Sequence, residues 1–141
     1  MQVNPYLNFN GNSEEAFNFY KSVFGGDFAV VMRFKDNPQC GDLTEADKER
    51  LMHIALPLNG GGMLMASDAL ESFGQKLNAG NNFYISLSPE TRDEADRLFA
   101  GLSDGGKIEM PMSDMFWGYF GCFADKFGVQ WMLNVSNGQP A

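Results

Sequence analysis

Histidine, cysteine and basic residues are scarce in this chain of 141 residues. One histidine and two cysteines leave few of the side chains that hold zinc or iron in proteins. Ten Lys and Arg stand against 18 Asp and Glu, and the net charge of −8 disfavours contact with nucleic acid phosphates or an anionic membrane surface. We therefore expect neither nucleic acid nor a membrane among the partners.

Long apolar runs are also missing. No stretch approaches the ~20 apolar residues that a membrane helix needs, and the first residues lack the basic and apolar pattern of a secretion signal. These two absences predict a cytoplasmic protein. Cys40 and Cys122 lack the spacing of a metal-binding pair, so we expect two free thiols rather than a disulfide or a zinc site.

Apolar residues are plentiful, at 44% of the chain, with 13 Phe and nine Met. Such a composition is globular. It predicts a Phe-rich core in which Met fills gaps, or alternatively an apolar binding cleft. The length suits one compact domain, or two small halves that share a core.

The segment 13–24 has the period of an amphipathic helix. The side chain of Asn12 or Ser13 would cap the first turn of this helix, and Gly25 and Gly26 would end it. The strand 5–9 precedes it, with one polar and one apolar face. The apolar positions of the helix are Ala16, Phe19, Tyr20, Val23 and Phe24, while Leu7 and Phe9 face away from Tyr6 and Asn8 in the strand.

The same layout returns about 78 residues later. A strand over 83–87 is followed by a capping box from Thr91 to Glu94, and Gly105 and Gly106 end the second helix. Its apolar stripe is Ala95, Leu98, Phe99 and Leu102.

Three further strands complete each half. They are predicted at 27–35, 51–58 and 63–67, then at 107–112, 119–124 and 129–135, with a short helix at 44–50 and a loop at 36–43. The alternation over 27–35 predicts a half-buried strand. The fold class is therefore α+β: module 1 at about 1–70 and module 2 at about 79–137, joined by a linker at 69–81, each β-α-β-β-β. We expect a curved mixed sheet with helices on its outer face.

The order of these motifs resembles the vicinal oxygen chelate (glyoxalase/bleomycin-resistance/dioxygenase) superfamily. Three segments narrow the likeness to its PhnB-like branch, whose members often carry the label 3-demethylubiquinone-9 3-methyltransferase. The label itself finds no support in the sequence, because no dinucleotide-type glycine-rich turn follows a strand. The segments that carry the resemblance are Leu7 to Gly25, Met65 to Asp68, Phe116 to Gly118, and Asp125 to Gly128 with Trp131.

The resemblance implies paired β-α-β-β-β modules and a homodimer. In metal-dependent members, His, Gln and Glu at four cleft positions hold a divalent ion. Those positions fall here at Asn4, about Met65, Asn82 and Met132. Two amides and two thioethers are poor ligands for a catalytic divalent ion. We therefore expect no metal and no other cofactor.

Several residues remain as candidates for function. Polar residues on the inner face would line a ligand cleft or be hydrogen-bonded within the core. His53 and Asp68 are possible acid and base, or else a structural histidine and a turn cap. Trp117 on a loop would be a lid or a plug in a dimer interface. The expected ligand-binding set is Tyr6, Asn8, Met65, Ser67, Tyr84, Ser86, Trp117 and Met132.

Three functions are compatible with these residues. The first is a metal-free protein that binds a small organic ligand in an aromatic and Met-lined cleft. The second is an enzyme of the lyase, isomerase or dioxygenase type with atypical metal ligands, or one that uses His53 and Asp68. The third is a drug-sequestering protein, for which the acidic charge would suit a cationic drug.

Overall fold

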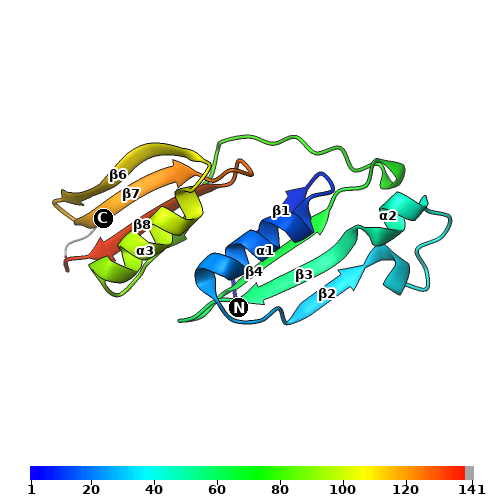
Figure 1. Cartoon of the computed structure of the whole chain (residues 1–141), viewed down its shortest axis with the longest axis horizontal. Helices are drawn as coiled ribbons and strands as arrows, with labels where there is room; N and C mark the ends of the chain where they lie inside the picture. Colours follow the sequence, from blue (N-terminus) through cyan, green and yellow to red (C-terminus); the bar gives the residue numbers. More distant parts are fainter. Residues whose placement is uncertain (139–141) are drawn as a thin grey trace. The chain divides into compact units, whose positions relative to one another are not determined.

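The computed structural model describes residues 1–138, which fall into two compact units. Unit 1 comprises Met1–Asn78, and unit 2 follows from Ala79. Each unit contains one four-stranded mixed sheet and one long helix (Figure 1).

The strands of unit 1 lie in the order β1-β4-β3-β2. The first strand pairs in parallel with the last, and the remaining pairs are antiparallel. The first and last strands of the unit must therefore come together to complete the sheet. The elements are β1 (Tyr6–Phe9), α1 (Ser13–Phe24), β2 (Val30–Arg33), the 3₁₀ helix η1 (Phe34–Asp36), α2 (Glu45–Glu49), β3 (Leu51–Pro57), β4 (Met63–Asp68) and the 3₁₀ helix η2 (Glu71–Phe73).

Helix α1 covers one face of this sheet and packs on β3 and β4. The buried positions on the helix are Ser13, Ala16, Phe17 and Tyr20. The expected stripe was therefore wrong in part, because Phe17 is fully buried while Phe19 is only half-buried. Phe17 meets Phe9 of β1 and Tyr20 edge-to-face. Ala16 and Tyr20 are buried as expected, whereas Ser13 and Phe17 take the places expected for Val23 and Phe24, which are half-buried.

Strand β2 is a second correction. It is shorter than the expected 27–35 and is exposed along most of its length, with Val31 at 45%. Its position at the edge of the sheet explains this, because an edge strand has a neighbour on one side only. The short helix was predicted correctly, and the Thr44 hydroxyl accepts a hydrogen bond from the Asp47 backbone N–H.

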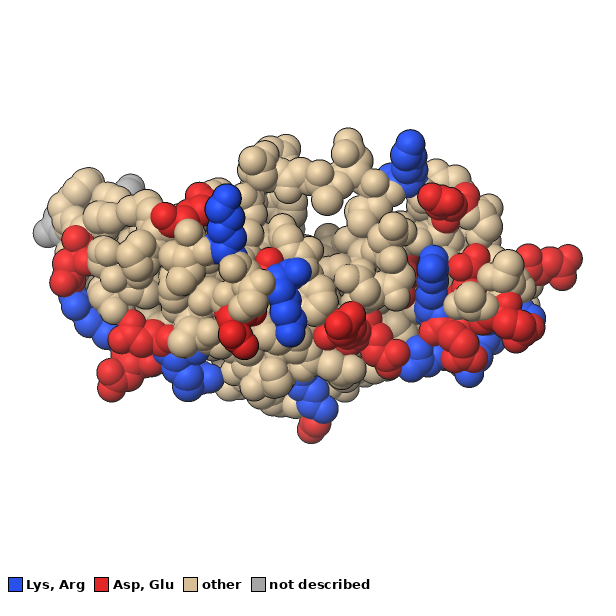
Figure 2. Space-filling view, turned by 45° about the horizontal axis from the view of Figure 1, so that its top comes forward, with Lys and Arg blue, Asp and Glu red and all other residues tan. Residues whose placement is uncertain are grey.

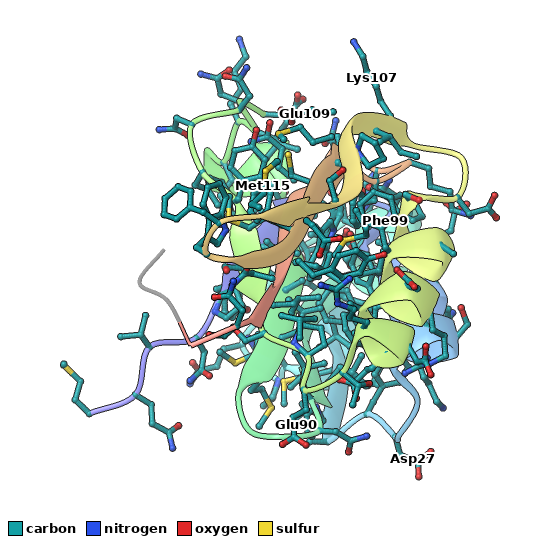
Figure 3. All side chains as sticks on the ribbon, turned by 90° about the vertical axis from the view of Figure 1, so that its left-hand side faces the viewer. Asp27, Glu90, Phe99, Lys107, Glu109 and Met115 are labelled. Carbon is teal, nitrogen blue, oxygen red and sulfur yellow. The ribbon has the colours of Figure 1, made fainter. Side chains whose placement is uncertain are left out.

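Unit 2 has the strand order β5-β8-β7-β6, again with first and last strands parallel. Its helix α3 covers one face, and all four residues of the predicted stripe are buried. Phe99 of α3 reaches toward the sheet and meets Phe123 of β7 (Figure 3). The elements are β5 (Ile85–Leu87), α3 (Arg92–Ser103), β6 (Lys107–Met115), β7 (Gly118–Ala124) and β8 (Gln130–Ser136).

Strand β6 runs three residues further than expected and changes register twice. Pro111 lies within the second irregularity, where a missing N–H is tolerated.

Acidic and basic side chains are interspersed on the face shown in Figure 2. None of the helices within residues 1–138 could cross a membrane.

Candidate functional site

The face of the unit 1 sheet opposite α1 carries polar and thioether side chains. Alternation along each strand places there the residues between the core positions. The register brings Tyr6 beside Met65, Asn8 beside Ser67, and Met32 beside His53. We call this set of six residues the open face of unit 1: Tyr6, Asn8, Met32, His53, Met65 and Ser67.

Two polar contacts organise the open face of unit 1. The Tyr6 hydroxyl lies 2.9 Å from Nδ1 of His53, and the two rings stack with centroids 5.6 Å apart. The Ser67 hydroxyl donates to the Asn8 carboxamide oxygen at 3.3 Å. Tyr6 is nevertheless 46% exposed. The polar groups therefore satisfy one another and still offer surface to a ligand.

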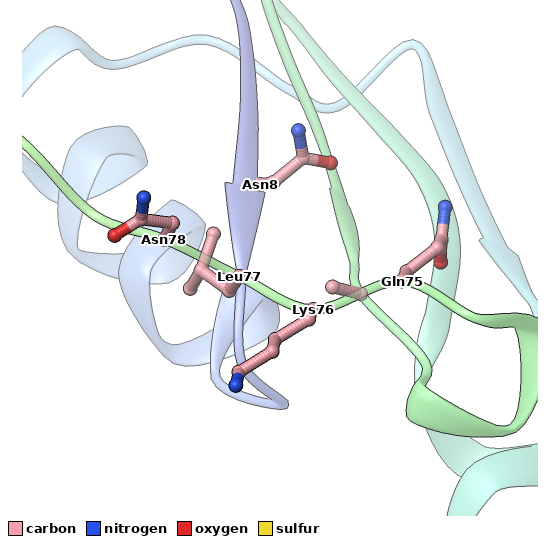
Figure 4. Close-up of a pocket in the computed structure, with 6 residues that line it drawn as sticks. Asn8, Gln75, Lys76, Leu77 and Asn78 are labelled. Carbon is pink, nitrogen blue, oxygen red and sulfur yellow. The ribbon is translucent and has the colours of Figure 1, made fainter.

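A cavity of about 320 Å³ adjoins the Asn8 end of this face (Figure 4). The segment that follows β4 forms its other wall, and the Gln75 side-chain oxygen accepts a hydrogen bond from the Leu70 N–H. This accepted bond fixes the Gln75 amide in one orientation. The cavity is lined by Asn8, Ala69, Gln75, Lys76, Leu77 and Asn78.

Unit 2 has an equivalent uncovered face. Ser86 of β5 lies beside Met132 of β8, which lies beside Cys122 of β7. The Tyr84 hydroxyl donates to both carboxylate oxygens of Glu109, at 2.8 and 2.9 Å. That hydrogen bond to an anion raises the pKa of the Tyr84 phenol.

The structure does not bring His53 and Asp68 together. His53 lies on the open face, whereas Asp68 points to the side that α1 covers and is 2% exposed. Asp68 accepts hydrogen bonds from the backbone N–H groups of Ser13 and Leu51, at 3.0 and 2.9 Å. Its carboxylate therefore joins the start of α1 to the start of β3, and the observed contacts assign it a structural role.

The four positions of the family metal site carry two amides and two thioethers. The Asn4 side-chain oxygen accepts a hydrogen bond from the Met63 N–H and so supports the strand edge. Met65 is paired with Tyr6, the first residue of β1, whereas Met132 is paired with Ser86, the second residue of β5. The two methionines therefore occupy different positions along the strands of their units. Asn82 precedes β5 and is exposed. Within residues 1–138, no three His, Cys, Asp or Glu side chains gather as a metal cluster would require. These residues do not fit a divalent ion.

Trp117 lies in the tight turn between β6 and β7. It packs edge-to-face against Phe120 and against Phe116, which is 76% exposed. Asn137 holds the turn by donating to the Phe116 and Trp117 carbonyls. The exposed aromatic of this turn is thus Phe116, while Trp117 is half-buried.

Residues 1–134 match the family model described as 3-demethylubiquinone-9 3-methyltransferase. The chain belongs to this family. It is 32% identical to protein YjdN of Escherichia coli (strain K12), over 99% of both chains. The crystal structure of PA1353 from Pseudomonas aeruginosa is 37% identical, with a TM-score of 0.85 over 96% of this chain and 98% of that one.

More distant structures share the fold. The putative 3-demethylubiquinone-9 3-methyltransferase, PhnB protein, from Bacillus cereus is 27% identical, with a TM-score of 0.74 over 96% and 100% of the two chains. A glyoxylase/bleomycin resistance protein/dioxygenase domain from a Frankia species is 14% identical, with a TM-score of 0.66 over 97% and 98%. The PhnB-like chain therefore has the glyoxalase/bleomycin-resistance fold, as its motifs predicted.

Sequence reasoning missed part of both faces. Four residues were not among the expected site residues: Met32, Glu109 and Cys122 lie beside residues that were, and Met110 lies beside Cys122. Each depends on pairing between strands that are distant in sequence. The alternation of residues along each strand predicts which face of the sheet they occupy, but it does not predict which residues of the next strand lie beside them.

Proposed function

We propose that this PhnB-like protein binds a small organic ligand on the open faces of its sheets, without a divalent ion. The supporting observation is the exposed pair of contacts in unit 1, Tyr6 with His53 and Asn8 with Ser67, beside a cavity of about 320 Å³. Membership of the family and fold establishes the glyoxalase-like scaffold on which this proposal rests.

The chemistry of the open face of unit 1 suggests the class of ligand. A phenol, an imidazole, a carboxamide and a hydroxyl exchange hydrogen bonds, while Met32 and Met65 offer polarisable apolar surface. Sites for small molecules commonly combine such apolar lining with a few polar groups. The expected ligand therefore has a flat or aliphatic body with one or two hydrogen-bonding groups.

Ligand-detected NMR with a library of small aromatic amides and acids tests this proposal. We expect hits whose binding weakens about tenfold in Tyr6→Phe, because the hydroxyl that orders His53 is lost. Tyr119→Phe is the matched control, since its hydroxyl donates to Asp96 of α3 instead. Hits that bind both variants and the original chain equally would contradict the proposal.

The proposed absence of a divalent ion has its own test. Elemental analysis of the untagged protein should find no stoichiometric zinc, nickel or iron, because the side chains at Asn4, Met65, Asn82 and Met132 are neutral and weak donors for these ions. One tightly held equivalent of any of the three would disprove this part.

A second function, acid–base catalysis, is favoured by the Tyr6–His53 contact. A hydroxyl at 2.9 Å from Nδ1 orients the ring, and an imidazole can both accept and donate a proton. Any turnover found should fall by about 100-fold or more in His53→Gln. Unchanged turnover in that variant would rule this function out.

We further propose that the protein is a cytoplasmic homodimer. The resemblance to the superfamily supports the dimer, and the exposed apolar strand β2 provides surface that a second copy could bury.

A further inference from the structure

Three sulfur-bearing side chains form a row across the uncovered face of unit 2. Met110 of β6 is paired with Cys122 of β7, and Cys122 is paired with Met132 of β8. Directly opposite residues on neighbouring strands project to the same face, with Cβ atoms about 4.5–5.5 Å apart. One thioether therefore flanks the central thiol on each side.

The irregular register of β6 creates this row. Ile108 is opposite Phe123, so a regular ladder would place Glu109 opposite Cys122. The register shift after Ile108 pairs Met110 with Cys122, while the Glu109 carboxylate accepts the hydrogen bond of Tyr84 and still acts on the thiol. A soft thioether thus lies beside the thiol in addition to the carboxylate.

The surroundings of Cys122 favour a bound cation. Cys122 is a free cysteine and only 6% exposed. Burial raises the pKa of its thiol, the nearby Glu109 carboxylate raises it further, and the Met110 backbone N–H lowers it. The negative charge of the Glu109 carboxylate near this buried position favours a cation there.

We propose that Cys122, Met110 and Met132 bind one soft monovalent cation, of the copper(I) or silver(I) type. A thiolate with two thioethers is a donor set suited to copper(I). Binding exchanges the thiol proton for the ion: Cys–SH + Cu⁺ gives Cys–S–Cu + H⁺, with no change of oxidation state. The resulting copper–thiolate unit is neutral, which suits a poorly solvated position.

This site is separate from the ligand site of unit 1, and Met132 is the one residue that it shares with the four family positions for a divalent ion. It does not depend on the proposed function. A chain that binds copper(I) and no organic ligand would leave this inference standing, and the reverse result would remove it.

Anaerobic titration of the full chain with copper(I), against the chelator bathocuproine disulfonate, tests the site. We expect one equivalent to bind, with affinity falling at least 100-fold in Cys122→Ser and at least tenfold in each of Met110→Leu and Met132→Leu. Affinity should rise about tenfold per pH unit below the pKa of the thiol, because one proton is released.

Two control variants isolate the row. Met115→Leu changes a methionine of the same strand that is opposite Gly118, and Cys40→Ser removes the other thiol. Both should bind copper(I) as the original chain does. Equal affinity in Cys122→Ser, or unchanged affinity in both Met→Leu variants at the row, would overturn the proposal.

A measurement on the unsubstituted chain guards against variants that fail to fold. Copper-edge X-ray absorption of the loaded protein should show sulfur as the only first neighbours of the ion. Nitrogen or oxygen as the main neighbours would overturn the assignment of these three residues.

Discussion

At the scale of single residues, the buried Asp68 is the most demanding position in unit 1. Its two oxygens accept the backbone N–H groups of Ser13 and Leu51. In Asp68→Asn, the carboxamide NH₂ would face one of these donors, and that N–H would lose its acceptor. We expect a loss of about 1–3 kcal/mol in the free energy of unfolding, measured by urea titration.

Asp42→Asn is the control for Asp68, because Asp42 lies in an exposed loop. Its unfolding midpoint should match that of the original chain. A small effect of Asp68→Asn, equal to that of Asp42→Asn, would mean that the two backbone donors find other acceptors.

At Gly118 the backbone lies very close to the backbone of Val135. A Cβ built there would lie 2.4 Å from the Val135 carbonyl oxygen, although the glycine has an ordinary φ. Backbone cannot move aside as a flexible side chain can, so Gly118→Ala should destabilise the chain by about 1–3 kcal/mol. Gly80→Ala, where a Cβ meets open space, should change the thermal midpoint little. Equal midpoints in the two variants would contradict this account.

The thiol of Cys122 should react slowly. Its pKa is raised by burial and by Glu109, so the reactive thiolate is a smaller fraction at pH 8 than for an ordinary cysteine. We expect Cys40 to be alkylated by iodoacetamide before Cys122, as followed by peptide mass spectrometry. Glu109→Gln removes one cause of the shift and should speed the reaction of Cys122, while Glu90→Gln should leave it unchanged.

At the scale of elements, α1 depends on Phe17 more than on Phe19. Phe17 is fully buried between Phe9 and Tyr20, so Phe17→Ala should cost about 3–5 kcal/mol in the free energy of unfolding. Phe19→Ala, at a half-buried position, should cost about 1 kcal/mol. Denaturant titration of the two variants compares them directly, and a larger loss for Phe19→Ala would restore the stripe expected from sequence.

The two long helices show how far periodicity predicts packing. In α3 the buried stripe was predicted residue by residue, because its other positions are mostly polar. In α1 the apolar residues extend around the helix, and two stripes fit the sequence equally well. Only the sheet beneath decides that Phe17 rather than Phe19 is buried.

The strands, like the helices, have features that the sequence predicts and features that it does not. The covered and uncovered faces of β1 and β4 follow from simple alternation and were predicted. The register of β6 with β7 could not be predicted, since only the second of its two shifts includes a proline, and the first leaves no signal in the alternation of residues. The partners of Asp68 were equally hidden, because backbone N–H groups 55 and 17 residues away leave no trace in side-chain pattern.

At the scale of the whole molecule, association is the property most open to measurement. We expect light scattering at micromolar concentration and neutral pH to give twice the chain mass of 15.6 kDa. Replacing Val31 of the exposed strand β2 with Lys should shift the protein toward monomer if that strand is buried between copies. A monomeric mass for the original chain would exclude the homodimer.

The parallel pairing of first and last strands has a consequence for synthesis of the chain. Strand β1 has no pairing partner until Met65 of β4 has been synthesised. Strand β5 likewise has none until Trp131 of β8 has been synthesised. During translation, Leu7 and Phe9 are therefore exposed until the ribosome has made most of unit 1. A product truncated before Met63 would keep both residues unprotected, and such nascent fragments should be substrates for chaperones and proteases.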